Sequence, residues 1–260
     1  YLLLQPVLQS FQVKRELYAP LNAADRAGQI VRRLSDAVAL GLLQPGDRLP
    51  AETDLAEVFE VAPATVREAL ARLRDARVIE TRRGRNGGSF IVEAPIESAE
   101  QRAGRLHSYS TIDLRDLGDE WAMITTACVR LAQDRHDHTD IERLKHDVTR
   151  FENAPSLSLR NQHYSRFWID LAVTAQSARL LSHQMRIQFE IAAMLWPEHR
   201  DTNDLNAAVN GMHDIIAAIG HPHSPAENVV NEMIRRDSRF LIAEKLRIER
   251  ASIRQKGIDR

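Results

Sequence analysis

The sequence of 260 residues is poor in several features, and each shortage narrows what the protein can be. It holds one cysteine, Cys128, which cannot form an internal disulfide and therefore fits a reducing compartment such as the cytoplasm. No apolar run approaches the ~20 residues that a bilayer-spanning helix needs, so we expect no membrane partner. The formal net charge is -1, which excludes a protein that coats nucleic acid through its total charge.

Glycine and proline divide the chain into two parts. They cluster between Gly84 and Pro95, and aromatic residues, 5% of the whole, are sparse before that point. The opening residues are apolar but lack the basic start and the small-residue cleavage site of a signal peptide, so we predict an N-terminal arm. The expected order is an arm at 1–20, a first domain at 21–94, a polar, aperiodic linker at 95–110, a helical domain at 111–250 and a C-terminal tail at 251–260.

The first domain has the element order of a winged helix-turn-helix. Apolar residues at helical spacing predict helices over 24–40, 52–59 and 64–76. Two short β-branched runs, at 77–80 and 89–93, flank a loop rich in glycine and arginine and predict a hairpin. Such a module places its third helix in the major groove of DNA and its wing beside the backbone. The sequence therefore predicts a DNA-binding domain.

Positive charge gathers on the third helix and the wing, although the whole chain is nearly neutral. Residues 67–85 hold seven arginines against three acidic residues. Guanidinium groups bind both phosphate and guanine edges, so this segment is the expected DNA contact surface. The candidate contact residues are Thr53, Ala64, Thr65, Arg67, Arg72, Arg82, Arg83, Arg85, Asn86, Gly87 and Gly88.

The stretch 41–92 closely resembles the DNA-binding domain of the GntR superfamily of bacterial repressors. The residues that carry the resemblance are Pro45-Gly46-Asp47-Arg48-Leu49-Pro50, Glu52, Leu55-Ala56, Thr65-Val66-Arg67-Glu68-Ala69-Leu70, Leu73 and Gly87-Gly88. The resemblance implies that Arg67 contacts operator DNA and that the wing glycines let the loop approach the minor groove. The sequence departs from the family pattern at Thr53, where arginine is usual, and at Ala62-Pro63, where Ser-Arg is usual. We therefore expect Arg67, Thr65 and the wing arginines to carry more of the affinity.

The second part of the chain is helical almost to its end. An amphipathic helix begins near Asp113, and further helices are predicted over 141–153, 158–174, 178–195, 204–219 and 225–250. Residues 178–195 are apolar nearly all round and are expected to lie centrally. We predict a mainly α fold, in which a winged helix-turn-helix of three helices and a β-hairpin precedes an all-α bundle of six to seven helices.

This layout is similar to the FCD domain, the ligand-binding domain of the FadR-like branch of the superfamily, over residues 110–245. Many members of that branch hold a divalent metal between an aspartate and a histidine four residues apart and two later histidines. Here Tyr164 and Trp168 take the first two positions, His213 keeps the third, and the fourth falls near Arg236. One remaining ligand cannot make a metal site, so we expect neither a metal nor another cofactor.

The pocket that remains in this domain is expected to have an apolar lining and a cationic rim. Resemblance to metal-free members that bind fatty acyl-CoA implies a lipid-like effector, a fatty acid or an acyl-CoA. The candidate pocket residues are Trp121, Tyr164, Trp168, Met185, Arg186, Phe189, His213 and Arg236. Two alternatives stay open: a metal or small carboxylate as effector, and a helical domain that serves dimerisation only.

These observations together predict a cytoplasmic transcriptional repressor that binds a short palindromic operator in double-stranded DNA as a homodimer. One recognition helix reads few base pairs, so a two-fold dimer adds specificity. No arrangement of nucleophile, base and acid side chains stands out, and the glycine-rich loop 84–88 lacks the lysine of a phosphate loop. We therefore expect no enzyme activity.

Overall fold

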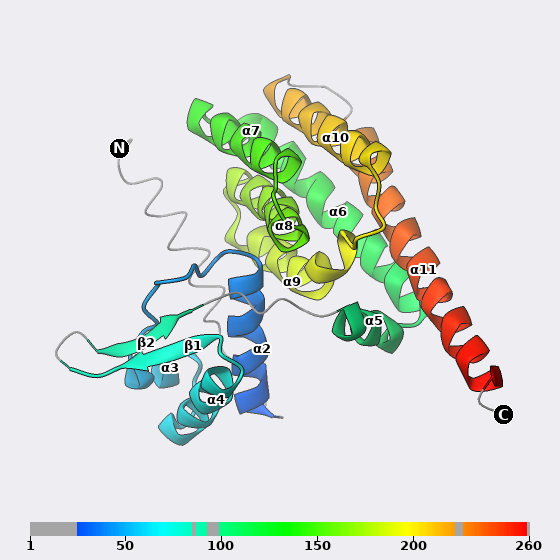
Figure 1. The fold of residues 1–260 in the computed structure, drawn as a ribbon. Coiled ribbons are helices and arrows are strands. Elements are labelled where there is room, and N and C mark those ends of the chain that lie inside the picture. Colours follow the sequence, from blue (N-terminus) through cyan, green and yellow to red (C-terminus); the bar gives the residue numbers. More distant parts are fainter. Residues whose placement is uncertain (1–24, 85–86, 93–98, 222–225, 259–260) are drawn as a thin grey trace. The chain divides into compact units, whose positions relative to one another are not determined.

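The computed structural model describes residues 25–84, 87–92, 99–221 and 226–258, and Figure 1 draws its elements. The predicted arm at 1–20 lies outside these residues. The chain divides into two compact units, Tyr1–Ile96 and Glu97–Arg260. The described residues of the first unit form three helices and a two-stranded hairpin, and those of the second are helical, so the predicted fold class is confirmed. Among the described residues, no helix is both long and apolar enough to cross a lipid bilayer.

Helices α2 (Arg26–Ala39), α3 (Glu52–Val58) and α4 (Pro63–Asp75) make up the helical part of the first unit. Each presents its apolar residues on one face, because these residues recur at three- and four-residue spacing. The side chains buried in the core are Ile30, Leu34, Val38, Leu55, Phe59, Val66, Leu70 and Leu73. Each such burial stabilises the fold by about 1.5–3 kcal/mol relative to exposure, so this core fixes how α4 is presented.

A tight turn separates α3 from α4. Glu60 adopts a left-handed backbone with φ 54°, and the Val61 N–H donates to the Ala56 carbonyl at 3.0 Å. The chain re-enters a helix at Pro63, a first helical position where a backbone N–H has no partner to lose. These residues form the predicted helix-turn-helix.

The wing hairpin begins two residues later than the sequence predicted. Arg77 takes a left-handed backbone with φ 58°, so β1 spans Ile79–Arg82 rather than 77–80. It pairs antiparallel with β2 (Gly88–Ile91). Arg82 therefore belongs to the strand, whereas the sequence pattern assigned it to the loop.

The Pro-Gly-Asp-Arg-Leu-Pro segment at 45–50 forms a third arm of the wing. The Gly46 N–H donates to the Ile91 carbonyl at 2.8 Å, and the Leu49 N–H donates to the Ser89 carbonyl at 2.9 Å. These bonds cover the second edge of β2 with paired backbone groups, which protects it from other chains. The residues at 45–50 therefore have a structural role, which is to hold β2 by backbone hydrogen bonds.

The second unit contains more helix than the sequence predicted. Its described residues form helices α5 (Ala99–Ser108), α6 (Thr111–Arg135), α7 (His138–Glu152), α8 (Leu157–Thr174), α9 (Ala178–Leu195), α10 (Thr202–Gly220) and α11 (Ala226–Ile258). Helix α5 occupies much of the predicted linker 95–110, because its Leu106 is buried and Ser110 begins α6 with a capping box. Helix α11 runs through most of the predicted tail 251–260, which contains no proline to end it.

Helix α8 lies at the centre of this unit, in contact with α6, α7 and α9 (Figure 1). From Tyr164 to Thr174, every residue of this helix except Arg166 is buried. Helix α9, which the sequence placed centrally, exposes His183 and Arg186. The sequence predicted the wrong central helix because α8 buries polar residues together with their hydrogen-bond partners, and hydrophobicity alone does not predict such burial.

A buried carboxyl pair joins α7 to α8. Asp147 of α7 and Asp170 of α8 are both almost fully buried, and Nε of Arg166 donates to Asp170 at 2.9 Å. Burial, together with the negative charge of Asp170, raises the pKa of Asp147 to about 8. Asp147 therefore carries a proton in the folded protein at neutral pH and loses it on unfolding.

We expect the folded state to lose stability as the pH rises from about 5 to about 8. An unfolded aspartate has a pKa of about 3.9, so the native state binds the extra proton in this window and raising the pH favours unfolding. The substitution Asp147→Asn keeps the shape without the titrating proton, so it should flatten this slope and raise the thermal midpoint near pH 8 by several degrees. Thermal unfolding followed by circular dichroism at both pH values checks this, and equal slopes in the two proteins would contradict it.

Candidate DNA interface and the interior of the helical unit

The side of α4 opposite its apolar face is exposed to solvent. Ala64 and Arg67 are exposed there, and Thr65 is half-buried. The Arg67 guanidinium has no hydrogen-bonded partner within the described part of the chain. Ala62 supplies no side-chain cap, so the positive end of the helix dipole is left open beside these residues. The face is therefore suited to a negatively charged backbone.

Two of the predicted DNA-contact arginines are paired with acidic neighbours. Arg72 donates to Glu68, one helical turn away, at 2.6 Å. Arg82 donates to Glu80 at 2.7 Å, and its guanidinium lies 4.4 Å from the centre of the Phe90 ring. Exposed ion pairs contribute only ~0–1 kcal/mol, so a DNA phosphate can displace either carboxylate.

Glycine is required at two positions of the wing. A side chain at Gly87 would place its Cβ 2.5 Å from the Arg82 carbonyl oxygen. Gly88 has φ 149°, and a Cβ there would lie 2.8 Å from Nε of Arg48. The family resemblance attributes these glycines to the approach of DNA, and the structure adds a second reason: at Gly87 the backbone leaves no space for a Cβ, and at Gly88 the positive φ strains any other residue.

The remaining predicted contacts are partly described. Thr53 is exposed in the first turn of α3, and its hydroxyl donates to Asp54 at 3.3 Å. Arg83 is exposed where β1 ends. Arg85 and Asn86 lie outside the described residues.

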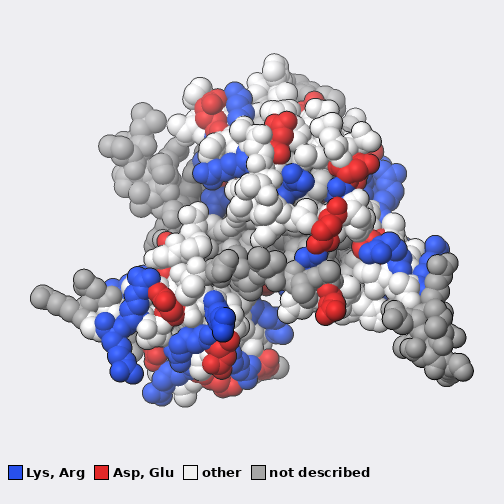
Figure 2. Space-filling model, in the orientation of Figure 1, with Lys and Arg blue, Asp and Glu red and all other residues white. Residues whose placement is uncertain are grey.

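The sequence pattern missed two exposed arginines of the same unit. Arg48 bridges to Phe90 of β2, and its side chain lies beside Gly88, in the strand pair next to the wing loop. Arg74, in the last turn of α4, donates to the Thr81 hydroxyl at 3.3 Å and so links the helix to the wing. Figure 2 shows Lys and Arg side chains gathered over this unit, with acidic side chains between them. Arg48 could have been found, since it stands inside the motif at 45–50.

Three predicted pocket residues form one aromatic cluster inside the helical unit. Trp121 and Trp168 meet edge to face with ring centres 5.2 Å apart, and Tyr164 lies 5.9 Å from Trp168. All three are buried, as is Met185 of α9, and Phe189 is half-buried. The helical spacing of these residues therefore identified an interior correctly.

Two other pocket candidates, Arg186 and His213, do not reach this interior. Arg186 is exposed on α9 and pairs with Glu120 of α6, and His213 is exposed on α10. Each follows a buried methionine, Met185 or Met212, that takes the inward direction, and a neighbouring residue on a helix points about 100° away. Both are corrected to surface positions.

A buried polar centre, which the sequence did not reveal, adjoins the aromatic cluster. Asp237 of α11 accepts hydrogen bonds from the Tyr164 hydroxyl and, at 2.9 Å, from Arg200 in the loop between α9 and α10. The Arg200 side chain is only 1% exposed. Its guanidinium lies 4.4 Å from the Trp196 ring centre and 4.1 Å from that of Phe240. Burial, and then the Asp237 charge, raise the pKa of the Tyr164 hydroxyl above its usual value.

The donor set of this interior does not fit a divalent metal. Tyr164 and Trp168 stand where the FCD resemblance implies two ligands, His213 is exposed, and Arg200 brings a positive charge to Asp237. Within the described ranges, no group of three or more His, Cys, Asp or Glu side chains could hold a metal ion. A guanidinium that already neutralises the buried carboxylate repels a second cation.

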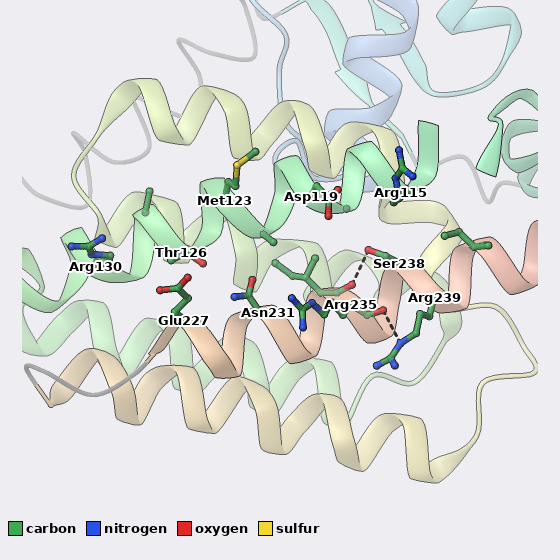
Figure 3. Close-up of a pocket in the computed structure, with 15 residues that line it drawn as sticks. Arg115, Asp119, Met123, Thr126, Arg130, Glu227, Asn231, Arg235, Ser238 and Arg239 are labelled. Atoms are coloured by element: carbon green, nitrogen blue, oxygen red, sulfur yellow. Dashed lines mark hydrogen bonds between the residues drawn. The ribbon is translucent and has the colours of Figure 1, made fainter. Parts of the chain in front are cut away.

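A groove of about 870 Å³ runs along the outside of the helical unit between α6 and α11 (Figure 3). Ala122 and Met123 lie in its middle, and Met123 is 67% exposed. The two helices run antiparallel along it, with Arg115 and Arg239 toward one end and Glu227 at the other (Figure 3). The groove therefore has an apolar middle, and charged residues of both signs lie along it, because Arg130 lies at the same end as Glu227 (Figure 3).

Comparison with known proteins finds bacterial regulators. Residues 26–91 match the family described as "Bacterial regulatory proteins, gntR family". RmpR of Mycobacterium gastri, named an HTH-type transcriptional regulator, is 38% identical over 234 residues, 89% of this chain and 85% of RmpR. MngR of Escherichia coli (strain K12), named a mannosyl-D-glycerate transport/metabolism system repressor, is 38% identical over 65 residues, 25% of this chain and 26% of MngR. Among solved structures, E. coli McbR/YncC is similar over 87% of this chain and 99% of its own, with 15% identity and a TM-score of 0.47.

We expect Gly87→Ala to weaken DNA binding without unfolding the first unit. The new Cβ would meet the backbone oxygens of Arg82 and Gly84, so the wing must open to admit it. Affinity for a duplex selected by the wild-type protein from a random library should fall about tenfold or more, equivalent to ~1.4 kcal/mol. Gel-shift titration measures it. Gly104→Ala, where a Cβ meets nothing within 4 Å, is the control, and equal affinity of the two variants would contradict the prediction.

Proposed function

The chain belongs to the gntR family of bacterial regulatory proteins, and we propose that it represses transcription as a homodimer on a palindromic operator, under the control of a small-molecule effector. It is a transcriptional regulator with a DNA-binding helix-turn-helix, not an enzyme. The observation that carries the proposal is the open face of α4, where Arg67 has no partner in the described chain. Repression is supported by the name of the relative MngR. Because bacterial operator DNA lies in the cytoplasm, we assign the protein to that compartment.

In this proposal, α4 is the element that contacts the base edges of the operator. A helix of this kind enters the major groove, where the Arg67 guanidinium can donate two hydrogen bonds to guanine. The paired arginines Arg72 and Arg82 exchange their carboxylates for phosphates and so position the domain without reading sequence. The full set of proposed contacts is Thr53, Ala64, Thr65, Arg67, Arg72, Arg82, Arg83, Arg85, Asn86, Gly87 and Gly88.

The groove between α6 and α11 is the surface that we assign to dimerisation. Its apolar middle exposes Met123, and contiguous exposed apolar surface marks interaction sites. Arg239 lies toward the end opposite Glu227, and Arg235 lies nearer the middle (Figure 3). A second copy related by a two-fold axis would place this groove against the same groove of its partner, because a two-fold interface uses one surface twice. The exposed apolar middle at Met123, which such an axis can cover with its own copy, favours another copy of the chain as the occupant.

The helical domain is assigned to the FCD type of the FadR-like branch, with its interior as the effector site. Support comes from the buried Trp121, Tyr164 and Trp168 beside the polar centre at Asp237. A fatty acid or acyl-CoA, the class expected from the sequence, needs a long apolar cavity between these rings. Their direct contact favours the smaller alternative, a carboxylate-sized effector. Such a ligand controls DNA affinity by the difference in its own affinity for two arrangements of the protein.

We expect Arg67→Ala to abolish sequence-specific operator binding. Each lost guanine contact costs about 1–3 kcal/mol and a dimer loses two, so affinity should fall at least about 30-fold. Gel-shift titration against the selected duplex and a scrambled one measures the loss. Arg32→Ala, which removes an exposed arginine of α2, should bind as the wild type does. Unchanged affinity in Arg67→Ala would overturn the proposal.

We expect Met123→Glu to separate the dimer. Two carboxylates buried in the middle of a self-complementary groove repel each other and lose their hydration, so light scattering after size exclusion should report the mass of one chain. Operator affinity should fall with the lost second half-site. Leu159→Glu changes another exposed apolar residue, on α8, and should leave the dimer intact. If Met123→Glu remains dimeric, the interface lies elsewhere.

A further inference from the structure

Two arginines lie on one face of the wing sheet, and they come from different segments of the chain. Arg48 stands opposite Phe90 across one edge of β2, and Glu80 stands opposite Phe90 on β1. Residues that face each other on antiparallel strands carry their side chains on the same face of the sheet. Arg82, two residues beyond Glu80, lies on that face as well. We call this surface, made of Arg48, Glu80, Arg82 and Phe90, the outer wing face.

The opposite face of the sheet belongs to the core of the unit. Leu49, Ile79 and Ile91, which are sequence neighbours of the outer residues, are all buried. Successive side chains of a strand point to opposite faces, so the outer wing face is directed toward solvent. Arg48 is accordingly exposed. Its charged side chain is not required by the packing of the core.

The side chain of Arg48 occupies the space that Gly88 leaves open. A Cβ at Gly88 would lie 2.8 Å from Nε and 3.6 Å from Cγ of Arg48. Gly88 is the first residue of β2 and pairs with Arg82, the last residue of β1. The Arg48 side chain therefore extends from its own segment toward the end of the sheet where the wing loop begins.

The charges of the outer wing face do not cancel. Arg82 donates to Glu80 at 2.7 Å, and the structure describes no residue that forms a hydrogen bond or an ion pair with the Arg48 guanidinium. Two guanidinium groups against one carboxylate leave one positive charge. A guanidinium group forms short, charge-assisted hydrogen bonds with phosphate oxygens. Arg48 is therefore available to a phosphate without first leaving another partner.

We propose that Arg48 contacts a phosphate of the DNA backbone and extends the DNA-binding surface from α4 and the wing onto the segment 45–50. The wing of a winged helix-turn-helix lies beside the backbone, and backbone hydrogen bonds join the segment 45–50 to the wing sheet. The inference rests on the proposed mode of DNA binding and adds a residue to its contacts. Arg48 positions the wing on the duplex without reading the sequence, because phosphates are the same at every base pair.

The salt dependence of binding tests this contact. Each phosphate contact contributes about 0.9 to the slope of log affinity against log salt concentration, because binding there releases counterions. Arg48→Gln removes the charge and keeps a polar side chain, so this slope should become shallower by about 0.9 for each bound chain. At about 0.1 M salt the affinity should fall about eightfold for each bound chain, in the selected duplex and in a scrambled duplex alike. Fluorescence anisotropy titrations with labelled duplexes measure both quantities.

Two matched variants separate charge from shape. Arg48→Lys keeps the positive charge and should keep the slope of the wild type. Arg32→Gln removes an exposed arginine of α2 and should change neither the slope nor the affinity. Thermal unfolding followed by circular dichroism checks that every variant is folded.

Three results would overturn the proposal. The first is an Arg48→Gln variant with the slope and affinity of the wild type. The second is a loss of affinity at unchanged slope, which would mean that Arg48 only supports the shape of the wing. The third is a loss confined to the selected duplex, which would make Arg48 a base contact.

Failure of this inference is distinguishable from failure of the proposed function. If Arg67→Ala binds the selected duplex normally while Arg48→Gln makes the salt slope shallower, the proposed reading by α4 fails and the phosphate contact stands. If Arg67→Ala loses the selected duplex and Arg48→Gln keeps the slope of the wild type, the reverse holds.

Discussion

The buried ion pair between Asp237 and Arg200 is the constraint on which the interior of the helical unit depends. It joins α11 to the loop after α9, and the Tyr164 hydroxyl brings α8 to the same carboxylate. Removing one partner of such a pair costs about 3–5 kcal/mol, because the other charge stays buried without compensation. The neighbouring rings follow from this constraint: Trp196 and Phe240 cover a guanidinium that has almost no contact with water. An apolar core would not need this arrangement, which points to a use beyond stability.

The DNA-binding unit manages charge in the opposite way, at its surface. Arg72 and Arg82 keep carboxylates within hydrogen-bonding distance, and the chain as a whole carries a formal charge of -1. Phosphate contacts account for most non-specific affinity, so arginines that are paired in the free protein reduce indiscriminate binding. Arg67 has no such partner in the described chain. The residue that is expected to read a base is therefore available, while Arg72 and Arg82 must first exchange a partner before they hold phosphates.

Much of this structure could be predicted from the sequence, and the failures share one cause. Helical spacing identified α2, α3, α4 and the buried Trp121, Tyr164 and Trp168, because apolar side chains on one face must be covered. Spacing of apolar residues carries no information about polar groups that are buried with a partner. In the sequence, Asp237 is an ordinary polar residue of a long helix, and Arg200 lies in a loop without helical spacing. Neither residue is therefore predicted to be buried. For the same reason, the spacing of apolar residues did not predict that α8 lies at the centre of the unit, where Asp170 is buried against Arg166. Backbone strain at Arg77 likewise shifted β1, since no propensity marks that residue as left-handed.

Helix α11 connects the two proposed sites of the second unit. Arg236 and Asp237 belong to the interior centre, whereas Arg235 and Arg239 line the groove on the outside. Consecutive residues point about 100° apart on a helix, so α11 contributes side chains both to the interior and to the groove. A ligand in the interior can therefore act on the groove if it binds two positions of α11 with different affinity. On this reasoning, variants at the groove should alter the affinity for the effector as well, because coupling between two sites is reciprocal.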